Sequence, residues 1–309
     1  MPTIYAGEWA PEYGGPHLTE ADGPEGQAEV WEHSLLTSVD CPPLARALAF
    51  VDGVRRVEAQ LFYAEGNEEP APGIAGALAV GAVVPGPAGP LEVVEVEVRR
   101  LAIFGSGKTA SLPSQPGGWS WQTVTLEDTS LDAPMQELQR MMREREWALA
   151  ERLAAAGQLV CLDGPLHSTR DSKASIVGYV KTHHRRLLEP AAHAKVALLE
   201  HGQRTSLFTV SERHSCYFRL APRTSRHHPW FGIVRLEVSA AAGRQATVDT
   251  INAVCGTLPR YAGVSHVDPR APQNLQPVGA LERELRRRCG DTALGTRATR
   301  EAVAQLAGG

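Results

Sequence analysis

The chain has 309 residues, of which 43% are hydrophobic and 21% are charged, and its formal net charge at pH 7 is −4. These values are typical of a soluble globular protein with one large domain or two small ones. No run of eighteen apolar residues occurs, and the N-terminus lacks a basic segment followed by an apolar one, so we expect neither a membrane span nor a secretory signal. The five cysteines show no Cys-x-x-Cys spacing, which indicates reduced thiols in a cytoplasmic protein rather than disulfides or a zinc site.

The charge is unevenly distributed along the chain. Residues 1–100 carry 5 Lys and Arg against 16 Asp and Glu, whereas residues 170–235 carry 12 against 4. A basic segment inside an acidic protein is what binding to a polyanion such as nucleic acid requires. A solvated basic face without a ligand is the alternative interpretation of the same composition.

The N-terminal third predicts an arm followed by a β-meander. Residues 1–40 are rich in Gly, Pro and Glu, so we expect a loosely ordered arm that docks by its aromatic side chains, and a folded domain over residues 41–309. Residues 48–51 predict a buried strand that ends at Asp52 and Gly53, with residues 57–63 as its antiparallel partner. The apolar stretch 74–84 and the alternating stretch 91–104 complete the meander.

A helix is predicted over residues 132–157. Asp132 can cap it, Pro134 lies in its first turn and Gly157 ends it. Glu146 falls inside the apolar stripe of this helix, whereas Glu144 points to the opposite face. The helix therefore directs one carboxylate inward.

The remainder of the chain predicts alternating strands and helices. Strands are expected at residues 159–163, 175–179, 206–209, 216–220 and 230–238, and helices at 190–201, 246–258, 280–288 and 297–306. This order predicts a mixed α/β domain.

Two strands each end in Asp-Gly, at Asp52 and Asp163, and we expect their carboxylates to lie side by side. Burying a bare carboxylate is unfavourable by several kcal/mol, so such groups are hydrogen-bonded, ion-paired or metal-bound. Together with Glu146 they form a set of hard oxygen ligands suited to Mg²⁺ or Mn²⁺. Two such ions about 4 Å apart can activate a water and stabilise the leaving oxygen of a phosphodiester. The alternative for each Asp-Gly is an ordinary turn.

Six short motifs in a fixed order resemble the NurA nuclease family. They cover roughly residues 45–305 and comprise residues 50–53 (FVDG), 162–166 (LDGPL), 177–181 (VGYVK), 230–236 (WFGIVRL), 271–277 (APQNLQP) and 281–285 (LEREL). The resemblance implies a ribonuclease H-like α/β core with a mixed sheet flanked by helices. It also implies Mn²⁺-dependent digestion of DNA, a homodimer, and a partnership with the hexameric translocase HerA in DNA end resection and double-strand break repair.

The resemblance also implies roles for individual residues. Asp52 and Asp163 match the Asp-Gly metal ligands of the family. Its acidic helix residue corresponds to Glu144 or Glu146, and the inward face favours Glu146. A fourth ligand is expected near the end of the chain, where His266 is preferred; a turn role before Pro269 is the favoured interpretation of nearby Asp268.

Basic side chains are candidates for phosphate contact because a nuclease without sequence preference binds the DNA backbone. Lys181, at the end of a motif strand, is expected to contact the scissile phosphate. The other candidates for DNA binding are Arg185, Arg186, Arg213, Arg219 and Arg235, and some of them can equally be ordinary surface charges. Trp119 and Trp121 can stack on unpaired bases, although packing is the favoured interpretation.

Residues 104–109 (FGSGKT) resemble the end of a phosphate-binding P-loop. That motif requires a glycine where this chain has Ala102, and a helix directly afterwards, but the Pro- and Gly-containing residues 111–118 cannot be helical. We therefore expect no ATP site in this chain.

The sequence predicts a metal-dependent nuclease of single- and double-stranded DNA, acting as an exonuclease. The alternatives are a non-catalytic scaffold of the same fold that docks on the translocase and, less favoured, a P-loop nucleotide-binding protein.

Overall fold

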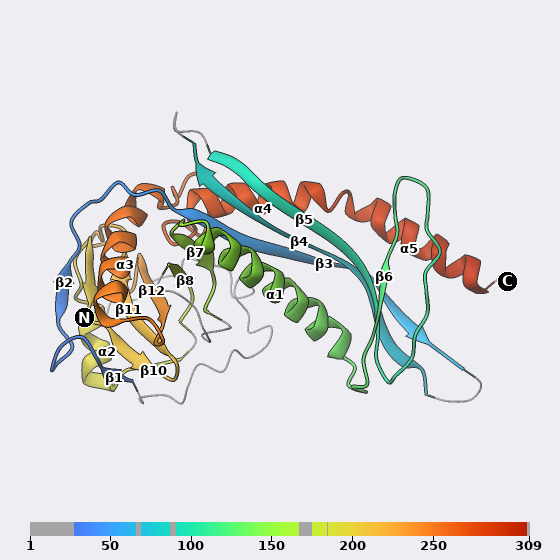
Figure 1. Ribbon diagram of the computed structural model, residues 1–309, viewed down its shortest axis with the longest axis horizontal. Helices are drawn as coiled ribbons and strands as arrows, with labels where there is room; N and C mark the ends of the chain where they lie inside the picture. The colour runs from blue at the N-terminus through green and yellow to red at the C-terminus, as the bar shows by residue number, and fades with distance from the viewer. Residues whose placement is uncertain (1–27, 66–68, 87–90, 167–174, 184, 308–309) are drawn as a thin grey trace. The chain divides into compact units, whose positions relative to one another are not determined.

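The computed structural model describes residues 28–65, 69–86, 91–166, 175–183 and 185–307 (Figure 1). The described chain divides into two compact units. Unit 1 contains residues up to 51, 83–92 and 150–279, and unit 2 contains residues 52–82, 93–149 and those from 280 onward.

The elements alternate as the sequence predicts. The strands are β1 (Glu29–Val30), β2 (Ser38–Asp40), β3 (Ala49–Tyr63), β4 (Ala71–Pro85), β5 (Leu91–Phe104), β6 (Gln122–Thr125), β7 (Val160–Asp163), β8 (Ile176–Val180), β9 (Gln203–Thr205), β10 (Phe208–Val210), β11 (Arg213–Arg219) and β12 (Ile233–Ser239). The helices are α1 (Ala133–Ala155), α2 (Pro190–Val196), α3 (Arg244–Thr257), a short 3-10 helix η1 (Leu258–Tyr261), α4 (Gln276–Arg288) and α5 (Thr292–Ala307).

The strands of the described residues form a large mixed sheet. Its hydrogen-bonded order is β1-β10-β11-β12-β8-β7-β3-β4-β5-β6, and β9 links β11 to β2. The predicted α/β class with a mixed sheet flanked by helices is confirmed, while its ribonuclease H-like character stays a prediction. None of the described helices has the length and apolarity needed to cross a membrane.

The centre of unit 1 is a parallel arrangement of short buried strands. The start of β3 pairs in parallel with β7, where Ala49 lies opposite Val160 and Val51 opposite Leu162. β7 in turn pairs in parallel with β8, and β12 and β11 continue the sheet in antiparallel fashion. Strands buried on both faces are expected to be continuously apolar, as β8 and the first three residues of β7 are. The strand predictions for residues 159–163 and 175–179 are confirmed.

Two predicted elements of unit 1 have different boundaries in the structure. The helix expected over residues 190–201 ends at Val196, because Leu198 and Leu199 hydrogen-bond only three residues back and the chain then turns. Of the strand expected over residues 206–209, only residues 208 and 209 lie in a strand, β10, while Ser206 and Leu207 lie between β9 and β10. Ser206 leaves the sheet between them and bonds to Thr37 through both its backbone N–H and its hydroxyl.

The segment before β3 belongs to the fold of unit 1 from residue 28 onward. β1 pairs with β10 and β2 pairs with β9, so part of the predicted arm contributes strands. Residues 1–27 lie outside the described residues, and the predicted domain boundary at residue 40 stays a prediction. An ion pair fastens this segment: Glu32 accepts two hydrogen bonds from Arg204, which is fully buried, and one from the backbone N–H of Leu207.

The Glu32–Arg204 pair makes stability depend on pH. Burial by itself raises the pKa of Glu32, but the hydrogen bonds from Arg204 and Leu207 outweigh it and lower the pKa below its usual 4.5. Because the folded-state pKa is the lower one, the stabilisation is present above pH 4.5 and is lost as the pH falls through the folded-state pKa. At neutral pH, Glu32→Gln should lower the free energy of unfolding by about 3 kcal/mol, because a buried guanidinium loses its carboxylate.

Urea unfolding at a series of pH values measures this effect. The difference between wild type and Glu32→Gln should shrink in acid, whereas the exposed Glu29→Gln should track the wild type throughout. An equal acid dependence in wild type and Glu32→Gln would contradict the assignment.

One prediction is wrong: Asp52 and Gly53 do not form a turn between two strands. β3 runs without interruption from Ala49 to Tyr63, so residues 57–63 continue the strand instead of pairing with its first part. The reason for the glycine is packing. A Cβ at position 53 would lie 2.5 Å from Glu146 Oε1 and 2.9 Å from Met142 Cγ, so Gly53 allows α1 to approach the strand closely.

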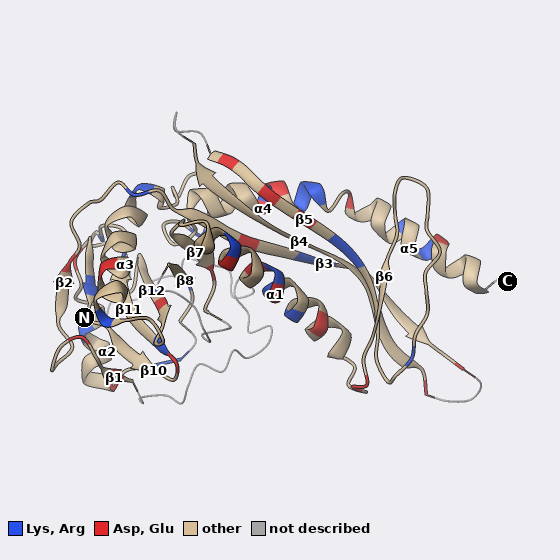
Figure 2. Cartoon of the chain, viewed as in Figure 1, with Lys and Arg blue, Asp and Glu red and all other residues tan. Residues whose placement is uncertain are grey.

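Unit 2 contains the predicted β-meander, with β3, β4 and β5 as successive neighbours. β4 is buried along almost its entire length and carries no charged residue, as its uniform colour in Figure 2 shows. Its two faces meet different helices: a Cβ at Gly76 would contact Leu138 of α1, whereas a Cβ at Gly81 would contact Leu281 and Leu285 of α4. Since alternate residues of a strand point to opposite faces, α1 and α4 cover opposite sides of β4.

The close approach of α4 to β4 predicts the effect of adding one methyl group. At Gly81 a Cβ would lie 2.8 Å from the backbone oxygen of Glu95 and 2.9 Å from Leu285 Cδ2. The backbone oxygen has no freedom to move away, so Gly81→Ala should destabilise the protein by about 1–3 kcal/mol through overpacking. Thermal and urea unfolding measure the change, and an unchanged urea midpoint would contradict this packing.

The loop that resembles a P-loop, residues 104–109, begins at the last residue of β5. Ser106 and Gly107 both have positive φ, at 56° and 67°. Residues 110–121 contain no helix, and β6, which the sequence analysis missed, then pairs in parallel with the end of β5. The predicted absence of a helix directly after Thr109 is confirmed.

Candidate metal centre

The register of two parallel strands aligns two aspartates. Val51 of β3 lies opposite Leu162 of β7, so the next residues along the two strands are Asp52 and Asp163. Parallel strands that are in register project level residues to the same side of the sheet. Asp52 is 6% exposed, and Asp163, at the end of β7, is half-buried. The strands therefore bring together the two carboxylates that the sequence analysis singled out.

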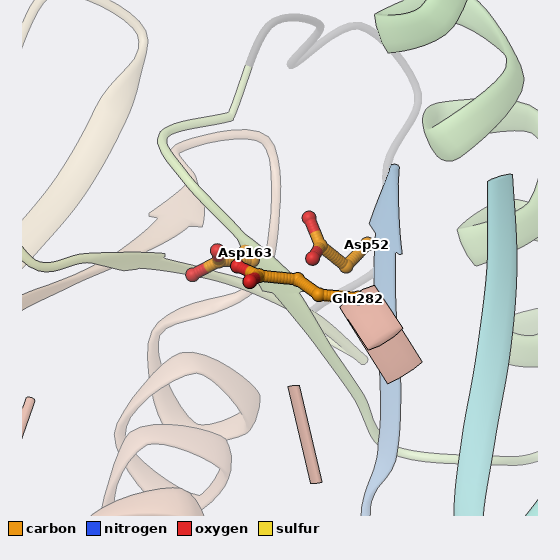
Figure 3. A group of neighbouring side chains, drawn as sticks. All are labelled: Asp52, Asp163 and Glu282. Carbon is orange, nitrogen blue, oxygen red and sulfur yellow. The ribbon is translucent and has the colours of Figure 1, made fainter. Parts of the chain in front are cut away.

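A third carboxylate comes from α4. This helix buries Val278, Leu281 and Leu285, which lie on one face at helical spacing, and Glu282 lies at the border of that face. Asp52, Asp163 and Glu282 each offer a carboxylate oxygen, and these three oxygens lie within 4.8 Å of one another (Figure 3). Among the described residues this is the group whose composition and spacing fit a bound metal ion.

The two oxygens of Asp163 have different surroundings. Its Oδ2 accepts a hydrogen bond from Lys181 Nζ at 2.6 Å. Its Oδ1 is buried and receives no hydrogen bond from any residue that the structure describes. An unsatisfied buried carboxylate oxygen is unfavourable unless a cation supplies the missing interaction. This oxygen, beside two further carboxylates, fits a hard divalent ion such as Mg²⁺ or Mn²⁺.

Lys181 is held by a second contact in unit 1. Its Nζ donates to Asn274 Oδ1 at 3.2 Å, and the Asn274 amide in turn donates to Asp268. Burial raises the pKa of Asp268, but hydrogen bonds from Asn274 and from the backbone and side chain of Arg270 more than compensate and lower it. Asp268, Asn274, Lys181 and Asp163 thus form one chain of polar contacts that fixes the lysine beside the carboxylates.

Glu144 and Glu146 lie on the faces of α1 that the helical pattern predicts. Glu146 is 4% exposed and packs against Gly53, the residue after Asp52, whereas Glu144 is exposed and pairs with Arg140. The inward orientation of Glu146 is confirmed. Glu146 is not part of the group of three oxygens, which contains Glu282 instead, and its role as a ligand stays a prediction.

The predicted fourth ligand His266 is exposed and lies outside that group. Asp268 has the turn role that the sequence analysis favoured, since its Oδ1 accepts from the backbone N–H of Arg270 at 2.8 Å.

The predicted phosphate-binding arginines fall into two sets. Arg185 and Arg186 are exposed, and Arg213 is half-buried beside Glu237. Arg235 is 1% exposed and bonds to Glu237, and Arg219, equally buried, donates to the backbone oxygens of residues 197, 199, 229 and 231. Because Arg219 and Arg235 have almost no accessible surface, we correct their assignment from DNA binding to a structural role.

The two tryptophans take part in packing, as the favoured interpretation holds. Trp121 is buried in a cluster with Phe104 and Ala298, and Trp119 packs partly buried against it with the Arg100 guanidinium 4.3 Å from its ring centre.

Sequence reasoning missed Glu282 and Asn274 as site residues. Glu282 lies in the motif at residues 281–285 and Asn274 in the motif at residues 271–277. Both motifs were identified by their resemblance to the family, and neither residue was given a chemical role. The position of Glu282 beside the stripe of Leu281 and Leu285 was the available signal, and it is the same signal that identified Glu146 in α1. For Asn274 the sequence contains no comparable periodic signal.

The sequence and the structure were compared with known proteins. No protein-family model matches the sequence, and no curated protein matches it. The structure is similar to the crystal structure of the NurA nuclease from Sulfolobus solfataricus, with a TM-score of 0.47 and 11% sequence identity over 88% of this chain and 86% of that chain.

The cluster of Asp52, Asp163 and Glu282 predicts that a substitution at Glu282 weakens metal binding, whereas one at Glu284 does not. Mutations of groups that only support a metal ligand weaken binding by about 10–100-fold, so removing a direct ligand should weaken it at least about tenfold. Glu282→Gln should therefore lose most of the Mn²⁺-induced rise in melting temperature. Glu284→Gln, two residues further along α4, is the matched control because Glu284 pairs with Arg287 and Arg288. Equal Mn²⁺ responses of the two variants would contradict the assignment of Glu282.

Proposed function

We propose that the chain is a metal-dependent deoxyribonuclease whose divalent ions are held by Asp52, Asp163 and Glu282. The observation that carries this proposal is that three carboxylate oxygens lie within 4.8 Å of one another. One of the three carboxylates is that of Asp163, whose buried Oδ1 receives no hydrogen bond from the described residues. A pair of ions in such a site supplies an activated water and stabilises the leaving oxygen of a phosphodiester.

The chain's own residues position the substrate. The Lys181 ammonium is held between Asp163 and Asn274, so it presents a fixed positive charge next to the carboxylates, where a scissile phosphate has to lie. Arg185 and Arg186 follow it on the surface and are suited to the neighbouring phosphates of the strand. Glu146, buried beside Gly53, is a further candidate ligand.

The finer properties of the proposed enzyme rest on the motifs that resemble the NurA family. They support Mn²⁺ as the ion, exonucleolytic digestion of single- and double-stranded DNA, a homodimer, and action with a HerA-type hexameric translocase in DNA end resection and double-strand break repair. The proposed cytoplasmic location rests instead on the five cysteines, which show no Cys-x-x-Cys spacing.

Digestion of end-labelled single- and double-stranded DNA tests the proposed activity. Wild type should release the label with Mn²⁺ and not with EDTA. Asp52→Asn, Asp163→Asn and Glu282→Gln should each reduce the rate by at least about 10²-fold, since the transition state loses several kcal/mol of charge stabilisation. Glu284→Gln should cleave at the wild-type rate.

If the wild type cleaves no DNA with Mn²⁺ or with Mg²⁺, even when the translocase is present, the non-catalytic scaffold is favoured. Cleavage by all three carboxylate variants would overturn the site assignment.

A further inference from the structure

A loop of unit 1 carries positive charge that the proposed active site does not use. Residues 222–228 connect β11 to the turn before β12, and we call them the basic loop. Arg223 and Arg226 are exposed, and no ion pair links either of them to a carboxylate within the described residues. Most exposed arginines on the helices of unit 2, by contrast, have an acidic neighbour one turn away, as Arg297 has in Glu301.

Local hydrogen bonds hold the basic loop in one conformation. The Thr224 backbone N–H donates to His227 Nδ1 at 3.2 Å. The backbone N–H of His227 donates in return to the backbone oxygen of Thr224 at 3.1 Å. The His227 ring stacks on Phe231 with the ring centres 3.6 Å apart and the planes nearly parallel. A loop fixed in this way loses little conformational entropy when a ligand binds to its two arginines.

A buried cation lies at the base of the loop. Arg219 bonds only to backbone oxygens, among them those of Pro229 and Phe231, so no carboxylate neutralises its charge within the described residues. Burial and the nearby charge of Arg223 lower the pKa of Arg219 to about 10, which still leaves it protonated at pH 7. Burial, followed by the charges of His227, Arg219 and Arg223, also lowers the pKa of His228. The loop therefore sits in a positive electrostatic potential.

The residues just after the basic loop contact the segment that follows Lys181. His183 lies 5.4 Å from the ring of Trp230 and bonds to the Ile233 oxygen, and His193 lies 4.6 Å from Trp230. Burial and then the charge of Arg186 lower the pKa of His193. The segment that follows Lys181 thus packs against residues that follow the basic loop in unit 1.

We propose that Arg223 and Arg226 of the basic loop bind the phosphate backbone of a nucleic-acid strand at a distance from the reacting phosphate. The inference rests on the proposed nuclease function and extends it by a second contact with the substrate. Nucleic acid is favoured over an acidic protein because the loop presents two arginines next to a buried third cation and carries no side chain suited to an apolar interface. Contact is sequence-independent, since arginine bound to phosphate reads no base.

Binding of a fluorescein-labelled single-stranded DNA oligonucleotide to the full chain in EDTA, followed by anisotropy, tests this inference without cleavage. Arg223→Ala/Arg226→Ala should weaken binding on the order of tenfold and reduce the slope of log K against log salt by about 1.4, or about 0.7 for each lost phosphate contact. Arg223→Lys/Arg226→Lys should retain most of the affinity. Arg297→Ala/Arg300→Ala is the matched control, with the same charge change and the same spacing on α5.

Three results would overturn the inference: equal affinities of Arg223→Ala/Arg226→Ala and the control, failure of the lysine variant to restore binding, or competition by polyglutamate as effective as by unlabelled DNA. Failure of the proposed function is recognised separately, because wild type would then bind DNA yet cleave none with Mn²⁺.

Discussion

The parallel pairing of β3 with β7 is the constraint on which the candidate site depends. Because Val51 lies opposite Leu162, the two aspartates that follow them are level and project from the same side. Two adjacent carboxylates with little exposure to solvent repel each other, and the arrangement is stable only with positive charge nearby. Lys181 supplies part of that charge, and the unsatisfied oxygen of Asp163 shows where more is needed. The chemistry of the site follows from this electrostatic requirement.

Close packing of α1 and α4 on the strands of unit 2 brings acidic side chains of these helices to the sheet. Glycines at positions 53, 76 and 81 lie where α1 and α4 meet the strands, so side chains of both helices pack directly against the strand backbone. At this distance an acidic residue next to the apolar stripe of a helix reaches the sheet. Glu146 of α1 reaches Gly53 in this way, and Glu282 of α4 joins Asp52.

The arginines of unit 1 show that similar residues take opposite roles a few positions apart. Arg219 is saturated by backbone oxygens and fastens the loop that follows β11, whereas Arg223 in that loop is exposed. Likewise Arg204 and Arg235 are buried against Glu32 and Glu237. The basic composition of residues 170–235 therefore combines structural cations with a smaller exposed set, and only the exposed set is suited to bind phosphate.

Local patterns in the sequence determined the β-meander, the strand that ends at Asp163, and the inward face of α1 with Glu146, because hydrophobic periodicity and helix-end signals depend on nearby residues alone. The pairing of two Asp-Gly strands was also predictable, although the turn expected at Gly53 was not formed. Only the tertiary structure decided that Gly53 serves a helix contact, that Glu282 joins the carboxylates and that Arg219 is buried. Each of these depends on segments far apart in the chain, whose approach is set by packing and by strand register. The helical pattern around Glu282 indicates its position beside an apolar stripe, but a local pattern does not determine which strand that stripe meets.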